Sequence, residues 1–487
     1  MISKNFKYSE FERSDTARMY GIDNSIPEEL KPRIKALVDN VLQPLRDVWG
    51  AMPINSGYRC KELNEKVNGE ETSQHCFDEE TEILTIDGWK HYNEINTNDS
   101  VFSYNIEKDI IEPTSIDKII IKKYNGELLR LSNKQLEVLT TDKHRMLVRY
   151  PSHKYVRRNT KNITEAGQKY FDSLKTNNDK WHIELAEEVF GKRRIFKCAG
   201  NSVAWAYGDL LFYKMCMAVI SDGYFCHKKS CNGIGVGFRF KKERKCRQIE
   251  KLLGELGWYF TKNLDANGVW NYYLRFEYGN KIFNAIGENK HIPNDVLSMG
   301  SNFIKELVLY YALYDGCGDK RENHNNINIS TVIKHNADIL QAMCAISNMR
   351  CVCTKMPEGT YNIKGKTGIA KEKYVLSINA LRNDSKAKED SYTKQKYNGI
   401  VWCVNNKNTT LIVRRNGKVS IQGNCTAEAA DVRCSNPLKL AQLAKDLGLP
   451  FDQIGLYPNF VHISHKYKGK QRGHIFYHKS YKGAKVV

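Results

Sequence analysis

A short sequence pattern is split across this chain by an intervening segment of 349 residues (76–424). The stretch ETSQHC begins a metal-binding pattern of the form S-x-H-x-x-G-x-A-x-D, but no alanine and aspartate follow Cys76 at the required spacing. The rest of the pattern stands at GNCTAEAAD (423–431). When residues 76–424 are removed, the flanks read SQHCTAEAAD, which completes the pattern except that Ala427 stands where Gly is usual. Residues 76–424 are therefore predicted to be an insertion that divides one small domain.

Nucleophilic residues mark the edges of this insertion. It begins with Cys76, ends with Asn424 and is followed by Cys425. The insertion resembles an intein, a self-excising protein segment, along its whole length. The segments that resemble splicing blocks are, in order, CFDEETEILTIDGWKHYNEI from Cys76, LTTDKHRML at 139–147 and VWCVNNKNTTLIVRRNGKVSIQGN, which ends at Asn424. The resemblance implies an all-β splicing domain of the Hint type, whose first block forms two short strands joined by a D-G turn.

The resemblance implies a role for each residue of the first junction. The Cys76 thiol attacks the carbonyl of His75 and turns the peptide bond into a thioester, which is covalent catalysis by a sulfur nucleophile. Thr141 and His144 form the T-x-x-H of the second block. Thr141 is expected to hold the junction amide, and His144 to protonate the departing amine of Cys76.

The second junction is expected to react through Cys425 and Asn424. The Cys425 thiol takes over the acyl chain, and the Asn424 side-chain amide then cyclises onto its own carbonyl and cuts the chain. The freed amine of Cys425 finally forms an ordinary peptide bond. The sequence departs from the family at two positions: Gly423 stands where His usually assists cyclisation, and Cys403 stands where many inteins carry Asp. Either Cys403 or a nearby basic residue is expected to assist the cyclisation.

The insertion carries most of the positive charge of the chain. Residues 76–424 hold 54 Lys and Arg against 39 Asp and Glu, so +15 of the formal net charge of +20 belongs to them. A basic surface is typical of proteins that bind a phosphate backbone, although many soluble domains are merely basic. Charge alone therefore leaves double-stranded DNA as one candidate partner.

Two copies of one pattern lie inside the basic segment. YGDLLFYKMCMAVISDGYF (207–225) predicts an apolar helix that runs into Asp222, and ELVLYYALYDGCGDK (306–320) repeats the design. The pair resembles the two helices of a LAGLIDADG homing endonuclease. In that family each helix presents one acidic side chain, and the two together hold a divalent metal such as Mg²⁺ for phosphodiester cleavage. Asp222 fits this role in the first copy.

The second copy departs from the endonuclease pattern. Cys317 takes the position of the metal-binding aspartate, and a hard cation such as Mg²⁺ prefers carboxylate oxygen over a thiol. Either Asp315 or Asp319 substitutes for it, or DNA cleavage is impaired while DNA binding persists. The simpler alternative is that both segments are core helices that end in D-G turns.

The rejoined flanks comprise 75 and 63 residues, 138 in total, which suits one small domain. Apolar residues at helical spacing predict a helix over 34–49, with Pro44 expected to kink it. PLKLAQLAKDLG (437–448) predicts a second helix that ends at its final glycine. PINSGYR (53–59) and FVHIS (460–464) are short and typical of strands.

The flanks resemble zinc peptidases of the D-alanyl-D-alanine carboxypeptidase type over nearly all of their length, through INSGYRCKELNEKV, SQHCTAEAAD and LYPNFVHIS. The resemblance implies the zinc ligands His75, Asp431 and His462, which leave one coordination position open for water. It also implies that Arg59 binds the substrate, since a guanidinium suits a peptide carboxylate or carbonyl. The implied substrate is a peptidoglycan peptide.

The general base of this peptidase is not evident from the sequence. Many relatives place Glu or Asp three residues before the last histidine ligand, and this chain has Asn459 there. Asp452 and Glu428 lie nearby in the sequence, and neither is a clear substitute.

The expected fold is multidomain: an all-β Hint splicing domain with an α+β LAGLIDADG endonuclease domain, inserted in a small α+β zinc peptidase domain. The expected ranges are the peptidase flanks at 1–75 and 425–487, the two parts of the splicing domain at 76–185 and 396–424, and the endonuclease at 186–395.

Composition sets the expected location. No apolar run reaches the ~18 residues of a membrane helix, and the N-terminus MISKNFKYSEFERSD is too charged for a secretory signal. The 14 cysteines are scattered without a C-x-x-C pair, as is typical of reduced thiols. We expect a cytoplasmic protein with no membrane partner, whose mature peptidase acts on the cell wall or in a phage particle.

Two other interpretations stay open at this point. In the first, the insertion binds DNA and the flanks form a non-catalytic phage structural domain. The zinc content of the spliced protein would distinguish this domain from a zinc peptidase. In the second, the insertion no longer splices and cleaves only one junction, which Gly423 makes conceivable.

Overall fold

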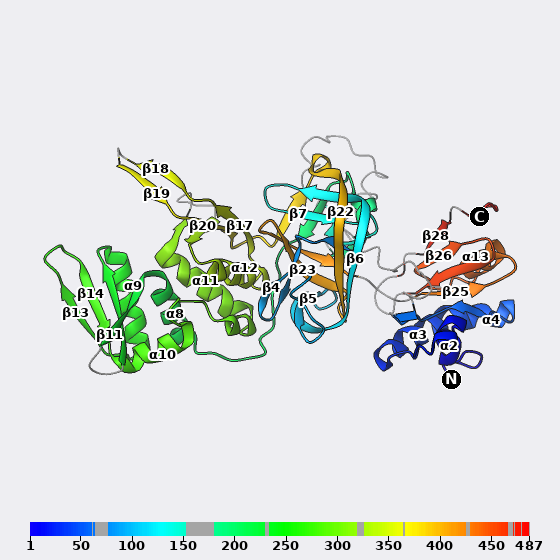
Figure 1. Ribbon diagram of the computed structural model, residues 1–487, viewed down its shortest axis with the longest axis horizontal. Helices are drawn as coiled ribbons and strands as arrows, with labels where there is room; N and C mark the ends of the chain where they lie inside the picture. The colour runs from blue at the N-terminus through cyan, green and yellow to red at the C-terminus, as the bar shows by residue number, and fades with distance from the viewer. Residues whose placement is uncertain are drawn as a thin grey trace, which may run out of the picture. The chain divides into compact units, whose positions relative to one another are not determined.

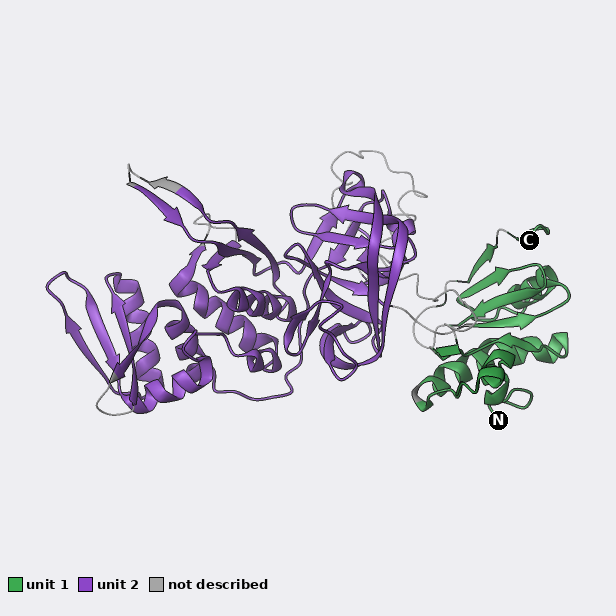
Figure 2. Cartoon of the chain, viewed as in Figure 1, with its two compact units in different colours: residues 1–72, 426–487 green, residues 73–425 purple. Residues whose placement is uncertain are grey.

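The computed structural model describes residues 1–60, 62–63, 76–151, 180–228, 233–318, 326–363, 366–424, 429–465, 471, 473–478 and 480–486. The chain divides into two compact units (Figure 2): Met1–Thr72 with Thr426–Val487, and Ser73–Cys425. The division lies three residues before Cys76 and one residue after Asn424. Within the described residues, no helix is long and apolar enough to cross a membrane.

The first unit packs helices against a sheet with the strand order β1-β25-β27-β26-β28, in which only β26 and β28 pair in parallel (Figure 1). Its strands are β1 (Ile54–Ser56), β25 (Ala429–Arg433), β26 (Gln453–Leu456), β27 (Phe460–Ser464) and β28 (His474–Tyr477). Its helical segments are α1 (Tyr8–Glu12), α2 (Asp15–Tyr20), η1 (Glu28–Leu30), α3 (Lys31–Leu37), η2 (Val38–Leu42), α4 (Gln43–Trp49) and α13 (Pro437–Asp446). The strands predicted within 53–59 and 460–464 are confirmed as β1 and β27.

The helix predicted over 34–49 is confirmed, and it is interrupted rather than continuous. The segment η2 is a turn of π-helix between α3 and α4. Pro44 follows it at the start of α4, and a proline cannot donate the helical hydrogen bond that the preceding turn requires. The helix predicted over 437–448 is α13, followed by Gly448 in the left-handed conformation with φ +60°.

Strand alternation gives this sheet one apolar face and one polar face. Val432 and Val461 are fully buried in a core with residues of α3, η2 and α4. Asp431 and His462, their neighbours along β25 and β27, point to the other face because successive side chains of a strand alternate. The two candidate zinc ligands of this unit therefore lie on the face away from the core.

The second unit contains the predicted splicing blocks, which form paired strands. The long strands β6 and β22 pair along nearly the whole of β22. The hairpin predicted in the first block is confirmed as β3 and β4, and the last blocks form β22, β23 and β24 up to Asn424. The bounds in this part are β2 (Phe77–Asp78), β3 (Glu82–Thr85), β4 (Gly88–Lys90), β5 (Ser100–Asn105), β6 (Ile110–Ser132), β7 (Glu137–Thr140), β8 (Arg145–Arg149), β9 (His182–Leu185), α7 (Ala186–Val189), β10 (Arg194–Lys197), β21 (Asp384–Ala387), η5 (Glu389–Ser391), β22 (Tyr392–Asn406), β23 (Thr410–Arg415) and β24 (Lys418–Gly423).

The rest of the second unit is an internal repeat. Each copy runs helix, strand, strand, helix, strand, strand, and the four strands pair in the order first, second, fourth, third. The first copy is α8 (Leu210–Asp222), β11 (Gly223–Lys228), β12 (Gly233–Phe240), α9 (Glu243–Leu256), β13 (Phe260–Leu264) and β14 (Trp270–Leu274), followed by α10 (Phe276–Ile286) and η4 (Asn294–Ser298). The second is α11 (Ser301–Asp315), β15 (Gly316–Gly318), β16 (Asn326–Thr331), α12 (Lys334–Ile346), β17 (Arg350–Met356) and β20 (Lys373–Asn379), with the hairpin β18 (Gly359–Ile363) and β19 (Lys366–Ala370) between its last two strands. The two helices predicted to end at Asp222 and Asp315 are confirmed as α8 and α11.

The first copy forms a four-stranded sheet of its own, whereas the strands of the second copy belong to the same sheet as the strands of the splicing blocks. Strand β10 pairs with β8 and β21, and β17 contacts β24, so strands inside the range 186–395 join those of the splicing blocks. The predicted domain ranges stay predictions.

Candidate functional site

The first junction of the insertion lies against the turn that carries the T-x-x-H residues. Strand β2 begins directly after Cys76 and pairs with both β7 and β22. Because Thr141 follows β7, it lies beside Cys76. The Cys76 amide donates a hydrogen bond to Thr141 Oγ1 (3.1 Å), and the Thr141 amide donates one to the Cys76 carbonyl (3.1 Å). Thr141 thus contacts the nitrogen of the bond that splicing would break.

His144 completes the same turn. Its amide donates a hydrogen bond to the Thr141 carbonyl (3.1 Å), which folds the chain back after β7. The imidazole is fully buried, and its centroid lies 4.3 Å from that of Phe77, the residue after Cys76. The structure therefore places both T-x-x-H side chains at the first junction.

The second junction lies against the next residue of this turn. The Arg145 guanidinium donates a hydrogen bond through Nη1 to the carbonyl oxygen of Asn424 (2.9 Å). Asn424 is fully buried, its amide nitrogen donates to the Thr409 carbonyl (3.0 Å), and its side-chain amide has no hydrogen-bond partner among the described residues. The carbonyl that cyclisation would attack is thus in contact with a positive charge.

The same packing accounts for Gly423, the first departure from the family pattern. A Cβ atom at this position would lie 2.7 Å from Arg145 Cβ and 2.9 Å from the Arg145 carbonyl oxygen. A histidine therefore cannot occupy position 423 unless β24 and β8 move apart. The clash involves only the Cβ and backbone atoms of residue 145, so any side chain at position 423 would meet it.

Cys403, the second departure, is fully buried on β22 in the same apolar cluster as Cys76. Its Sγ approaches the Val404 carbonyl at 3.7 Å, and Ile120 of β6 is opposite it in the sheet. Of the two alternatives for assisting cyclisation, a nearby basic residue has a direct contact with Asn424. His75 and Cys425, the other two residues predicted to take part in splicing, lie outside the described residues.

In the first unit, Asp431 and His462 are directly opposite each other on β25 and β27. His462 Nδ1 is 2.8 Å from Asp431 Oδ1, and both side chains remain partly exposed. A carboxylate and an imidazole in reach of solvent are chemically suited to a zinc ion. Among the described residues, no group of three or more His, Cys, Asp or Glu side chains forms a metal cluster, and the third predicted ligand, His75, is not among them.

Arg59 is exposed three residues after β1, which pairs with the strand of Asp431. The loop that carries Arg59 is held by the buried Asn24. Asn24 Nδ2 donates to the Tyr58 carbonyl (3.1 Å), and the Cys60 amide donates to Asn24 Oδ1 (2.6 Å). Sequence reasoning did not identify Asn24, because its two partners in this loop lie more than thirty residues away in the chain.

The candidate general bases differ in environment. Asp452 is buried, and its amide donates to the Ser464 carbonyl (2.7 Å), two residues after His462. Asn459 is exposed, and Glu428 lies outside the described residues. The geometry does not select a base.

In the repeat, helices α8 and α11 pack against each other and end at Asp222 and Asp315. Lys245 forms an ion pair with Asp222. Burial and, next to it, the negative charge of Asp222 together raise the pKa of Asp315 to about 6, and the opposing effect of the Lys245 charge is smaller. The two carboxylates are thus close enough to repel each other. Cys317 is exposed on β15, and Asp319 lies outside the described residues.

This repulsion predicts a pH-dependent effect of Asp315→Asn on stability. The carboxyl has a higher pKa in the folded state than in the unfolded state, so ionisation destabilises the fold above about pH 6, and this penalty fades as the pH falls toward 4. The asparagine variant should be more stable than wild type by about 1–2 kcal/mol at pH 8, since solvent screening reduces the full cost. Urea unfolding at pH 8 and pH 5 measures the difference. A gap that does not shrink at pH 5 would contradict the assignment.

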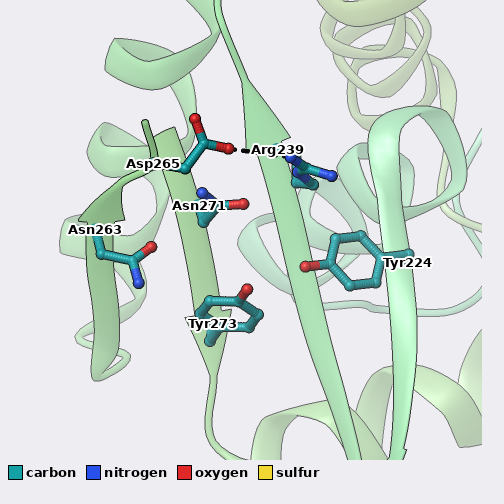
Figure 3. A pocket seen from close by; sticks show the side chains of 6 residues that line it. All are labelled: Tyr224, Arg239, Asn263, Asp265, Asn271 and Tyr273. Atoms are coloured by element: carbon teal, nitrogen blue, oxygen red, sulfur yellow. Dashed lines mark hydrogen bonds and ion pairs between the residues drawn. The ribbon is translucent and has the colours of Figure 1, made fainter. Parts of the chain in front are cut away.

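Each sheet of the repeat turns a polar face away from its helices. In the first sheet, Phe238 and Tyr272 are buried on the helical side. The other side holds a hollow with an Arg239–Asp265 ion pair (3.1 Å); it is lined by Tyr224, Arg239, Asn263, Asp265, Asn271 and Tyr273 (Figure 3). In the second sheet, Ser377 Oγ donates to Asn328 Oδ1 and Asn379 Nδ2 donates to Asn326 Oδ1, both at 2.8 Å.

Comparisons with known proteins match different parts of the chain. The Peptidase M15 family profile matches residues 4–97, so the N-terminal part contains a Peptidase M15 domain, and the matched range runs past Cys76 into the insertion. The ribonucleoside-diphosphate reductase subunit beta of Aquifex aeolicus is 26% identical over 381 residues, which cover 72% of this chain and 50% of that protein. The chain thus spans about half the length of the curated relative it matches.

Solved structures of LAGLIDADG proteins show partial similarity. The I-DmoI complex with DNA and Ca is 13% identical with a TM-score of 0.25, covering 35% of this chain and 82% of that chain. I-WcaI bound to its DNA recognition sequence is 13% identical with a TM-score of 0.23, covering 36% and 78%. The N-terminal LAGLIDADG domain of DUF199/WhiA is 8% identical with a TM-score of 0.23, covering 36% and 79%.

Proposed function

We propose that residues 76–424 excise themselves and join the flanks into a zinc-dependent peptidase. One observation carries this proposal: a single turn, residues 141–145, contacts both ends of the insertion, through Thr141 at Cys76 and through Arg145 at Asn424. A splicing reaction needs its two junctions in one site because the acyl chain passes from one to the other. The strands that bring them together come from opposite ends of the insertion.

The match to the reductase subunit supports the same proposal. It covers 72% of the 487 residues, far more than the 138 residues of the flanks, and therefore includes much of the insertion. A segment that resembles part of another protein, and that follows an N-terminal part matching the Peptidase M15 profile, has the distribution expected of an element that moves between hosts.

The geometry indicates how the first junction would react. Thr141 Oγ1 holds the amide nitrogen of Cys76, and the buried imidazole of His144 lies next to Phe77 in the same turn. The Cys76 thiolate forms a C–S bond to the His75 carbonyl carbon while the C–N bond breaks, and the freed nitrogen takes a proton from His144. Transfer to the Cys425 thiol then exchanges one thioester for another.

At the second junction, Asn424 Nδ2 forms a C–N bond to the Asn424 carbonyl carbon. The bond to Cys425 breaks, and the proton lost by Nδ2 balances the proton gained by the Cys425 nitrogen. Negative charge develops on the Asn424 carbonyl oxygen, where Arg145 Nη1 already donates a hydrogen bond. Arg145 remains protonated and acts as an electrostatic stabiliser, and not as an acid.

This role predicts a selective defect in Arg145→Met. Cleavage after Asn424 should slow by about 100-fold, as expected when one donor to a developing oxyanion is removed. The Cys76 thioester should still form and should still be cleaved by an added thiol. Lys143→Met is the matched control, because Lys143 lies two residues away and its ion pair with Glu187 is on the surface. Equal cleavage rates after Asn424 in the two variants, measured by gel electrophoresis, would contradict the role.

For the ligated product, we propose a cell-wall peptidase of the D-alanyl-D-alanine carboxypeptidase type. Members of the M15 family are zinc enzymes, and His75, Asp431 and His462 would hold the ion. When bound, zinc lowers the pKa of its water ligand and supplies a nucleophile at neutral pH. The Arg59 side chain is exposed to solvent, so its guanidinium is suited to orient the substrate peptide.

For the repeat within the insertion, we propose binding of double-stranded DNA. The two polar sheet faces carry Asn, Ser, Tyr and Arg side chains, which can donate to and accept from base edges in the major groove. Asp222 and Asp315, at the ends of the paired helices, would hold Mg²⁺ if the segment cleaves DNA. The excised segment should bind duplex DNA with a steep dependence on salt. Retention on DNA no better than that of a neutral protein at low salt would refute this.

A further inference from the structure

A buried arginine joins the splicing strands to the repeat. Arg414 of β23 is almost fully buried. Its guanidinium donates to both carboxylate oxygens of Glu82 on β3 (2.6 and 2.5 Å) and to Asp338 Oδ1 on α12 (2.6 Å). It also donates to Gln341 Oε1 on α12 (3.1 Å). A buried charge is stable only when it is paired, so Asp338 and Gln341 of α12 help to hold Arg414 in place.

Helix α12 contacts the splicing strands at two further points. Gln341 Nε2 donates to the Gly417 carbonyl (2.7 Å) in the turn between β23 and β24. Trp89 of β4 donates through its indole nitrogen to the Asp338 carbonyl (3.2 Å), and the Arg414 guanidinium lies 4.6 Å from the centre of its ring. The hairpin β23–β24, which leads to Asn424, therefore packs against helix α12 of the repeat.

The next residue, Arg415, extends this network to the junction. Its Nε donates to Asp78 (3.0 and 3.1 Å), two residues after Cys76, and its Nη1 donates to Glu137 (2.7 Å) at the start of β7. Strand β7 leads directly into Thr141. Burial alone would raise the pKa of Glu137, but hydrogen bonds from Lys418, Asn416 and Arg130 outweigh it and lower the pKa to about 2, so the carboxylate stays charged.

We infer that Arg414 and Arg415 are positioning residues of the splice junction, and that α12 supports them from the repeat. The inference rests on the proposed splicing activity. Arg415 fixes the two strands, β2 and β7, that set Cys76 against Thr141, and Arg414 fixes the same hairpin against Asp338 and Gln341. A side chain of α12 therefore controls junction geometry without touching a reacting atom.

The test measures splicing in full-length precursors that carry Asp338→Asn, Gln341→Leu, Arg414→Gln, and Asp338→Asn with Arg414→Gln. Asp338→Asn and Gln341→Leu should each slow thioester formation at Cys76 by about 10-fold, since small displacements of reacting groups cost this much or more. Lys334→Met is the matched control: Lys334 binds the other oxygen of Asp338 on the exposed side of α12, and its loss should leave the rate unchanged.

A double-variant comparison separates positioning from loss of stability. If α12 acts through Arg414, adding Asp338→Asn to Arg414→Gln should slow splicing no further, because each change alone already removes the ion pair between these two residues. Urea unfolding shows which variants are folded at the assay temperature. Folded α12 variants that splice at the wild-type rate, or effects that multiply in the double variant, would overturn the inference. Failure of the wild-type chain to form the thioester would instead overturn the proposed splicing.

Discussion

Expression of the unaltered chain should yield a ligated product of 138 residues and an excised segment of 349 residues (76–424). Cys76→Ala together with Asn424→Ala should block both junctions completely, because the first removes the sulfur that forms the thioester and the second removes the amide that cyclises. Asn424→Ala alone should stop after the acyl transfer, so that an added thiol still releases the N-terminal flank. Gel electrophoresis of freshly expressed protein distinguishes these outcomes.

The matched control for this prediction is Cys317→Ala, which removes an exposed thiol of the repeat and leaves both junctions intact. Its splicing should equal that of the unaltered chain. If the unaltered precursor persists intact under reducing conditions, the proposed splicing is wrong. If only one junction is cut and no ligated product forms, the alternative of junction cleavage alone is correct.

The second large effect concerns the peptidase, which splicing should switch on. In the precursor His75 and Asp431 are 356 positions apart in the sequence, and after removal of 349 residues they are 7 apart. Asp431 and His462 are already opposite each other on β25 and β27, so the missing ligand is the one at the junction. We predict that only the ligated protein binds zinc tightly and hydrolyses peptidoglycan-type peptides.

The comparison that checks this prediction uses the precursor locked by Cys76→Ala with Asn424→Ala and the ligated 138-residue protein. Both are assayed for bound zinc and for peptide hydrolysis, and a ligated protein with His462→Ala serves as the control without a zinc ligand. Equal zinc content and activity in the precursor and the product would show that the split pattern does not control the enzyme.

We also expect micromolar zinc to slow splicing reversibly, because zinc binds deprotonated cysteine and neutral histidine at the junction.

Local sequence patterns predicted the elements that carry the chemistry. The D-G turn identified the hairpin β3–β4, and the two apolar segments identified α8 and α11. These features depend on neighbours in the chain, so a single sequence contains them. The placement of Asp431 opposite His462 also agrees with their proposed common role, although the strand pairing itself was not predicted.

Long-range contacts account for what the sequence did not predict. Arg145 is one residue from His144, yet its role depends on the pairing of β8 with β24, which brings it to a carbonyl 279 residues away in the chain. At Gly423, the Cβ and the carbonyl oxygen of Arg145 occupy the space that a side chain would need. Likewise, the sequence shows Arg414 and Arg415 only as two charges in a basic segment. Their partners Asp338, Glu82 and Asp78 lie far away in the chain and are brought to them by the fold.

The peptide that spans the ligated junction gives the most direct test of the central claim. Tandem mass spectrometry of the digested 138-residue product should find the sequence SQHCTAEAAD, with His75 joined by an ordinary peptide bond to Cys425, together with an excised segment that begins at Cys76 and ends in a cyclised Asn424. Flanks that are recovered only as separate peptides, or still joined to residues 76–424, would contradict protein splicing.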